Sequence, residues 1–431
     1  MAWDFETDPE FQKKLDWVDT FLTEKVEPLD LVWPGLEFTP LEGKRREAVE
    51  PLKQEVRDQG LWATHLGPEL GGAGYGQMKL SLLNEMLGRS SWAPIVFGCQ
   101  APDTGNAEII AHFGTEEQKE RYLQPLLNGE LFSCYSMTEP QGGSDPGTFT
   151  CSAVKDGDEW VINGWKFFSS NAKTASFFIV MVVTNPDVEI YRGMSMFLVP
   201  ADTPGIKIEK NFGMGAEHEG SHALIHYDNV RVTADALLGD EGQAFAIAQT
   251  RLGGGRIHHA MRTIGLAQRA LDMMCERALS RRTQGSLLAD KQFVQGMIAD
   301  SYAQLKQFRL FVLYTAWSID KHNNYLKVRK DIAAIKVLMP GVLHDIAQRA
   351  IQIHGALGVT NDMPFTRMMV GAAVMGLADG PTEVHKVTVA KQVLRDYKPS
   401  EDLWPTRYGP TLKARAREKY AEYLEHEVGN L

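Results

Sequence analysis

Residues 176–184 read Ser-Phe-Phe-Ile-Val-Met-Val-Val-Thr, and this run of β-branched and aromatic residues is typical of a β-strand. Similar short runs lie at Glu159–Ile162, Met194–Val199 and His222–His226. Clusters of turn-forming residues separate them, for example Asp156-Gly157-Asp158. We therefore predict an antiparallel β domain over about residues 131–240.

Helical periodicity precedes this β block. From about residue 8 to 130, apolar residues recur every three or four positions, as in Phe11, Leu15 and Val18. The segment Thr115-Glu116-Glu117-Gln118 has the S/T-x-x-E/Q form, in which two side chains satisfy the free backbone donors at a helix start. It predicts a helix to about Leu127, and we assign residues 1–130 to a helical N-terminal domain.

Helical periodicity returns after the β block and predicts a bundle over residues 241–398. Four segments with this periodicity lie near residues 256–281, 288–322, 328–356 and 381–396. Four long helices joined by short loops usually pack as an antiparallel bundle. Residues 399–431 form a polar C-terminal extension, in which Leu412–Glu427 could be one charged helix. The fold class is α+β, mostly α. Because strands and helices do not alternate, a parallel nucleotide-binding sheet is disfavoured.

Composition narrows the partners and the compartment. The net charge of −10, from 45 basic and 55 acidic residues without a basic block, argues against nucleic acid as a partner. The four cysteines lack CxxC or CxxH spacing, so we expect neither a disulfide framework nor a bound metal. Residues 1–8 are acidic and do not resemble a signal or transit peptide. The longest apolar runs, such as 370–378, fall far short of the ~20 residues that span a bilayer.

These features predict a cytoplasmic protein without direct membrane insertion, although membrane contact through a partner stays open.

Three glycine-rich or hydroxyl-rich segments are candidate ligand loops. Leu70–Gly76 has the wrong spacing for a phosphate loop and no strand before it, so we interpret it as a loop between helices. Gly253–Gly255 is expected to form a flexible turn just before the first bundle helix, or to bring the backbone close to a ligand. In Ser136–Asp145, backbone N–H groups and hydroxyl oxygens could surround a phosphate or a ring edge.

The chain resembles the acyl-CoA dehydrogenase family in segments that follow the family's order and spacing. These segments are Met137–Asp145, Val161–Asn171, Arg281–Gly285 with Gln292, and Gln352–Gly358 followed by Asp379–Glu383. They span nearly the whole chain to about residue 398. Cys99–Asn106 and Leu377–Pro381 look most like the branch of family members ten and eleven. Some members of that branch carry a kinase-like domain, for which 431 residues leave no room.

The resemblance implies FAD held between the β domain and the bundle, and partly by a neighbouring subunit in a homodimer or homotetramer. It implies that Met137 and Thr138 meet the flavin's polar edge, that Phe168 covers the ring and that Ser170 bonds near N5. Across the subunit interface, Arg281 and Gln284 would reach the pyrophosphate and adenine. The full set of implied FAD residues is Tyr135, Met137, Thr138, Gly143, Ser144, Phe168, Ser169, Ser170, Arg281, Gln284, Gln352, Gly355, Ala356, Thr382 and Glu383.

Ser144, Arg256 and Gly380 are the implied substrate residues, and for Arg256 a plain surface charge is an equal alternative. Three positions depart from the family pattern. Gln284 replaces a common phenylalanine, Phe168 replaces a tryptophan, and Pro381 replaces a threonine.

The implied catalytic base is Asp379. The family places its carboxylate either in the late segment or one residue before the arginine that opens the bundle, and Gly255 occupies that second position. Without the resemblance, Asp379 would be interpreted as a helix N-cap. Because the run before Asp379 is apolar, we expect a raised pKa for this carboxyl. His258, His259 and His385 are expected to have structural roles.

The implied reaction is α,β-dehydrogenation of an acyl-CoA in fatty acid β-oxidation. Asp379 would take the α proton, flavin N5 the β hydride, and an electron-transferring flavoprotein the electrons, leaving a trans-2-enoyl-CoA. The Asp379 N–H and the FAD ribityl chain would hold the thioester oxygen. Since aspartate is one methylene shorter than glutamate, we expect a branched or substituted acyl group, or one seated differently.

Two other functions stay open: a flavoprotein oxidase of the same fold, similar to nitroalkane oxidases, and a scaffold without flavin. The sequence does not determine the length, branching or 4-position substitution of the acyl group, or whether the protein is a dimer or a tetramer.

Overall fold

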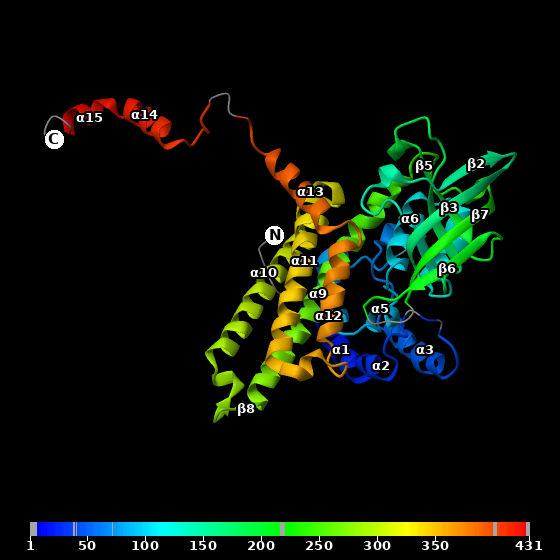
Figure 1. Cartoon of the computed structure of the whole chain (residues 1–431), viewed down its shortest axis with the longest axis horizontal. Coiled ribbons are helices and arrows are strands. Elements are labelled where there is room, and N and C mark those ends of the chain that lie inside the picture. Colours follow the sequence, from blue (N-terminus) through cyan, green and yellow to red (C-terminus); the bar gives the residue numbers. More distant parts are fainter. Residues whose placement is uncertain are drawn as a thin grey trace. The chain divides into compact units, whose positions relative to one another are not determined.

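The computed structural model describes residues 7–37, 39, 41–70, 72–215, 220–399 and 403–427. By its internal contacts the chain divides into a large unit, residues 1–386, and a small unit, residues 387–431. The large unit consists of a helical region, a β-sheet and a second helical region, in this order along the chain (Figure 1). The predicted α+β class and the order of its three parts are confirmed. No helix in the described ranges is long and apolar enough to cross a membrane.

The N-terminal helical region has its own apolar core. Phe11, Leu22 and Trp92 are among its fully buried side chains. The helices are α1 (Pro9–Phe21), α2 (Glu27–Val32), α3 (Gly43–Asp58), α4 (Gly76–Leu87), α5 (Ala93–Val96), α6 (Asp103–Phe113), α7 (Glu116–Gln118) and α8 (Gln124–Leu127). Thr115 and Gln118 form the predicted capping box, and the helical path from there ends at Leu127 as expected.

The middle region is a seven-stranded sheet, in the order β1-β4-β2-β3-β7-β6 with β5 paired to β4. Its strands are β1 (Ser133–Ser136), β2 (Ser152–Asp156), β3 (Glu159–Ser170), β4 (Phe177–Val183), β5 (Met194–Pro200), β6 (Ile206–Phe212) and β7 (His222–Thr233). Every residue of β4 is buried, which accounts for its unbroken apolar run. The sheet is mainly antiparallel, but β1 runs parallel to β4, with Ser133 opposite Phe177.

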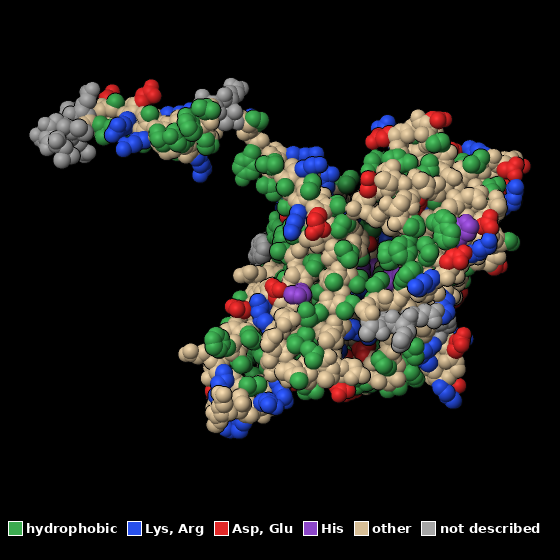
Figure 2. Space-filling view, viewed as in Figure 1, with side chains coloured by type: hydrophobic (Ala, Val, Ile, Leu, Met, Phe, Trp, Pro, Cys, Tyr) green, Lys and Arg blue, Asp and Glu red, His purple; other side chains and the backbone are tan. Residues whose placement is uncertain are grey.

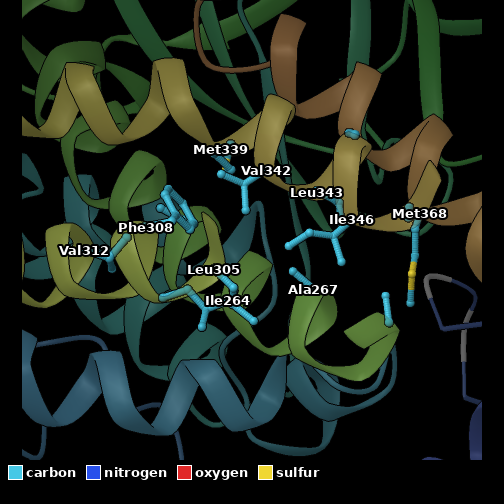
Figure 3. Close-up of a cluster of buried hydrophobic side chains, with 14 of the residues drawn as sticks. Ile264, Ala267, Leu305, Phe308, Val312, Met339, Val342, Leu343, Ile346 and Met368 are labelled. Atoms are coloured by element: carbon cyan, nitrogen blue, oxygen red, sulfur yellow. The ribbon is translucent and has the colours of Figure 1, made fainter. Parts of the chain in front are cut away.

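The second helical region is built around α9 (Ala244–Ser280), α10 (Gln292–His322), α11 (Tyr325–His354) and α12 (Phe365–Leu377). Its core includes Ile264 on α9, Leu305 and Phe308 on α10, and Ile346 on α11, whose side chains point toward one another (Figure 3). A small hairpin, β8 (Arg282–Thr283) and β9 (Ser286–Leu287), joins α9 to α10. The helix α12 was not predicted, and the predicted segment near 381–396 is α13 (Thr382–Leu394).

Two predictions about local structure are wrong. The Gly253–Gly255 segment is not a turn before a helix: α9 begins at Ala244, so the glycines lie inside it. Glycine costs a helix only about 1 kcal/mol per residue, and packing of the long α9 against its neighbours outweighs that cost. In the small unit, the single helix predicted over 412–427 is two helices, α14 (Gly409–Lys419) and α15 (Ala421–Glu427), because Tyr420 leaves the helical conformation.

Candidate active site

Asp379 lies in the short loop between α12 and α13 with an unusual backbone. Its φ of 54° is in the left-handed region, which costs a non-glycine residue about 1–3 kcal/mol. Two donors hold its carbonyl oxygen in place: Arg256 Nε at 3.0 Å and His385 Nε2 at 3.2 Å. Because α13 begins at Thr382, Asp379 is too early in the chain to be its N-cap. The loop is therefore strained and pinned at the residue that the sequence singles out.

The Asp379 side chain points toward α9. Its Oδ2 lies 3.5 Å from His259 Nε2, and the side chain is 19% exposed. A Cβ added at Gly255 would lie 3.4 Å from the same oxygen. The two positions at which the family resemblance allows a base therefore face one point, and only Asp379 supplies a carboxylate there. In the space-filling view, the surface is hollowed between the bundle and the sheet, and histidine side chains are visible within the hollow (Figure 2).

The expected raised pKa of Asp379 is wrong. Burial acts to raise the pKa of this carboxyl, but His259, together with the charges of Arg251, Arg256 and Lys336, lowers it below its ordinary value of 3.8. The prediction considered only the apolar run of α12, whereas these basic groups come from α9 and α11. The carboxylate is therefore ionised at neutral pH.

Hydrogen bonds to backbone carbonyl groups hold Lys336 and Arg256 close to this carboxylate. Lys336 is buried, and its ammonium group donates to the carbonyl oxygen of Met375 near the end of α12. Burial, aided by the charge of Arg256, lowers the pKa of Lys336 to about 8 against the opposing effect of Asp379. Arg256 is therefore no plain surface charge, because its guanidinium supports the Asp379 loop directly.

The sheet brings a second set of predicted residues together. Tyr135 on β1 pairs with Ser170 on β3, so the ends of these strands lie side by side. The Ser169 hydroxyl is buried 2.9 Å from that of Ser136, whereas Ser170 Oγ lies 2.9 Å from His222 Nδ1. Ser169 therefore bonds inside the sheet and is poorly placed for a ligand.

Phe168 departs from the regular path of β3. Its φ is 56° and its side chain is 50% exposed, so the strand turns an aromatic ring toward solvent. The ring also contacts Phe167, with ring centroids 3.6 Å apart. The backbone N–H of Phe167 donates to the carbonyl oxygen of Thr138 at 2.8 Å, which ties β3 to the loop after β1.

A buried ion pair fixes that loop. Lys166 Nζ donates to Glu139 Oε1 at 2.8 Å, and the two side chains are 0% and 1% exposed. Lys166 also donates to the carbonyl oxygen of Met137 at 2.8 Å. Burial would raise the pKa of Glu139, but Lys166 and several hydrogen bonds lower it. The backbone at Met137 and Thr138 is thus rigid, whereas Gly143 and Ser144 are exposed further along.

Family models cover almost all of the large unit. The N-terminal, middle and C-terminal domain models of acyl-CoA dehydrogenase match residues 8–130, 134–230 and 242–394. The chain belongs to the acyl-CoA dehydrogenase family. It is thus a member of a family of oxidoreductases, and the predicted likeness to members ten and eleven is borne out by its relatives.

Individual relatives agree with the family models. The chain is 44% identical to the acyl-CoA dehydrogenase FadE2 of Mycobacterium tuberculosis over 80% of this chain and 85% of that protein. It is 41% identical to acyl-CoA dehydrogenase family member 11 of Rattus norvegicus over 81% of this chain, but it spans only 45% of that protein. A solved acyl-CoA dehydrogenase structure from Mycobacterium abscessus has a TM-score of 0.84 and 38% identity, covering 91% of this chain and 100% of that one.

In this family member, five of the predicted FAD residues lie away from Asp379, near the ends of α9 and α11. Arg281 ends α9, and Gln284 follows it in the β8–β9 hairpin with a φ of 47°. Between residues 256 and 281 a helix rises roughly 38 Å, so one chain does not bring Arg281 to Asp379. Gln352 ends α11 nearby, and exposed Gly355 and Ala356 follow it.

The last predicted residues, Gly380, Thr382 and Glu383, follow Asp379 directly, and α13 begins at Thr382. Thr382 Oγ1 donates to the carbonyl oxygen of Gly376 at 3.2 Å, whereas Glu383 is exposed. Gly380, with a φ of 94°, lies against His385: a Cβ there would come 3.0 Å from His385 Nε2. Thr382 thus closes the turn after α12, and Gly380 makes room for the histidine that holds Asp379.

Sequence reasoning named Arg256 but did not place Arg251, His259 or Lys336 beside Asp379. His259 and Gly255 are four residues apart, so they share one face of a helix. That spacing would have pointed to His259, had residues 253–255 been assigned to a helix. Arg251 and Lys336 gave no comparable signal, because their approach to Asp379 depends on how α9, α11 and the loop after α12 pack.

Proposed function

We propose that this chain catalyses FAD-dependent α,β-dehydrogenation of an acyl-CoA thioester, with Asp379 as the base. The observation that carries the proposal is the Asp379 carboxylate, which faces Gly255 and lies within reach of four basic side chains. Its lowered pKa keeps it ionised and able to accept a proton at neutral pH. We also propose that the chain is divided into an N-terminal helical domain, a middle β domain, a C-terminal helical bundle and a C-terminal extension, with boundaries at about residues 130, 240 and 398.

The residues at the ends of β1 and β3 fit a flavin ring. A half-exposed aromatic side chain, Phe168, and the Ser170 hydroxyl lie beside a backbone segment that the Lys166–Glu139 pair holds rigid. A Cβ added at Gly143 would meet nothing within 4 Å, so the exposed part of the loop leaves room for a bound group. When bound, FAD supplies the hydride acceptor. Met137, Thr138, Phe168 and Ser170 would hold its ring, and Arg281, Gln284, Gln352 and Gly355 the far end of FAD from a neighbouring subunit.

The chain's own groups do the remaining work. Asp379 takes the α proton while Arg256 and His385 hold its backbone. Negative charge then develops toward the thioester oxygen, where the N–H of Asp379 is the proposed donor and Arg251, Arg256 and Lys336 supply a positive field. Fixed donors and charges of this kind can lower a barrier by several kcal/mol because they need no reorganisation during the reaction.

The acceptor and the compartment follow from the same proposal. We assign the electrons to an electron-transferring flavoprotein, and the pathway to fatty acid β-oxidation. Four free cysteines, three of them buried, favour a reducing compartment such as the cytoplasm. A homodimer or homotetramer would bring Arg281 of one subunit toward the flavin of another.

An anaerobic titration tests the proposal. The FAD-loaded protein is mixed with straight, branched and hydroxylated acyl-CoAs of several lengths, and the loss of flavin absorbance is followed. We expect at least one thioester to bleach the flavin, with reoxidation by an electron-transferring flavoprotein faster than by oxygen. If no thioester bleaches the flavin and a nitroalkane does, the chain is an oxidase of the same fold and the proposal fails.

A further inference from the structure

We infer that His259 is a positioning residue for the base: its Nε2–H holds Oδ2 of Asp379 and thereby leaves Oδ1 to take the substrate proton. The inference rests on the proposed function, because it deepens the role of the same carboxylate. Among the described residues, His259 is the single basic side chain in ion-pair contact with that carboxylate, at 3.5 Å.

The ring of His259 is neutral at neutral pH. Burial lowers its pKa below 6.5, and the charges of Arg262, Lys336 and Arg251 lower it further against the opposing effect of Asp379. A neutral imidazole next to a carboxylate is best placed to donate an N–H, because a lone pair there would be repelled. We therefore expect this 3.5 Å contact to shorten into a hydrogen bond when substrate binds.

Asp379 is then restrained at both of its ends. Arg256 and His385 hold its carbonyl oxygen by hydrogen bonds, and His259 Nε2 lies 3.5 Å from its carboxylate. The pKa of His385 is lowered to about 4 by burial and by Arg256, so it too is a neutral N–H donor. Gly255 faces the same oxygen as His259, since a Cβ added there would lie 3.4 Å from Oδ2.

The restraint matters because an aspartate has a short reach. A misplacement of about 1 Å in a reacting group can cost on the order of a hundredfold in rate. The groups that face Asp379 are Arg251, Arg256 and His259 on α9, Lys336 on α11 and Tyr135 on β1, with His385 following in α13. Of these, His259 alone contacts a carboxylate oxygen, so it sets the direction of the other oxygen.

The test compares His259→Gln with His259→Leu. The glutamine keeps an N–H donor of similar reach, whereas the leucine fills the space without one. With the thioester that bleaches the flavin fastest, we expect His259→Leu to lower kcat roughly 10- to 100-fold with little change in KM. We expect His259→Gln to keep kcat within about threefold, with an unchanged pH profile of kcat/KM above pH 6.

The neighbouring His258→Leu serves as the matched control. His258 is also buried on α9, and among the described residues its Nε2 has no hydrogen-bond partner. Thermal unfolding and FAD content establish that each variant is folded. If His259→Leu does not fold, His259→Ala, which also lacks a donor, replaces it. Equal losses in His259→Gln and His259→Leu, or full activity in His259→Leu, would overturn the inference. Asp379→Asn separates the two proposals: if it keeps turnover, the proposed function itself fails.

Discussion

Two carboxyl groups approach neighbouring glycines inside α9, and at neutral pH one is ionised whereas the other is mostly protonated. A Cβ at Gly255 would approach Asp379 Oδ2 at 3.4 Å, and a Cβ at Gly254 would approach Glu108 Oε2 at 2.7 Å. Burial raises the pKa of Glu108 to about 8, because Arg251 and a hydrogen bond with Tyr325 offset only part of its desolvation. The pKa of Asp379 is lowered instead.

The difference shows that the number of nearby cations decides the charge state more than depth does. Arg251 acts on both carboxyls and is itself fixed: its Nε donates to Asn106 at 2.8 Å, and its guanidinium lies 3.8 Å from the centre of the Tyr135 ring. Asp379 has three further basic neighbours, and Glu108 has none of comparable effect. Asp379 is therefore ionised at neutral pH, whereas Glu108 is mostly protonated.

The largest expected effect comes from removing the charged member of the pair. Asp379→Asn should lower the rate of flavin bleaching by about 10²- to 10⁴-fold, the range that general bases contribute. FAD should still bind, because the amide has nearly the same shape. Stopped-flow absorbance measures the rate, with Glu108→Gln as the matched control, which should stay within about tenfold of the unmodified protein. Equal losses in both variants would contradict the assignment of Asp379 as the base.

Removing the shared cation should affect both carboxyls. Arg251→Gln takes away a charge that lowers the pKa of Asp379 and of Glu108, so the acid limb of the kcat/KM profile should move to higher pH. Loss of the bond to Asn106 should also cost about 1–3 kcal/mol of unfolding free energy. Urea unfolding and the pH profile test the two effects, and an unmoved acid limb would show that Arg251 does not tune the base.

Alanine substitutions at Gly254 and Gly255 should have different effects on the free energy of unfolding. Helix propensity alone favours alanine over glycine by about 1 kcal/mol. Gly255→Ala makes an ordinary 3.4 Å contact and should keep most of that gain. Gly254→Ala places its Cβ 2.7 Å from Glu108 Oε2, so overpacking of about 1–3 kcal/mol should cancel the gain or reverse it. Urea unfolding of the two variants gives the difference, and equal stabilities would contradict the packing around Glu108.

The smallest effect concerns how stability depends on pH. Because the pKa of Glu108 is raised from 4.5 to about 8, the folded chain binds more protons than the unfolded chain between these values. The stabilising contribution of this group is therefore complete below about pH 4.5 and is lost as the pH rises toward 8. In Glu108→Gln, unfolding free energy should fall less steeply between pH 5 and 8. Parallel slopes in the two proteins would mean that Glu108 titrates normally.

Much of the fold follows from patterns within short segments. Three features could be predicted from the sequence because each depends on residues a few positions apart. They are the apolar run of β4, the capping box at Thr115, and the helical periodicity of α10 and α11. The family resemblance also points to Asp379 as the proposed base, since Gly255 at the family's other position cannot carry a carboxylate. The glycines of α9 misled the prediction because local propensity opposes a helix that tertiary packing stabilises.

The properties of the site were decided by tertiary structure. Residues 251, 259, 336 and 379 are far apart in sequence, and only the packing of α9, α11 and the loop after α12 brings their charges together. The same holds for the Lys166–Glu139 pair and for the parallel pairing of β1 with β4. The sequence by itself, through its family resemblance, pointed to the carboxyl that we propose as the base. The assembled structure determined its charge and direction, because electrostatic interactions act through space between residues that no local pattern connects.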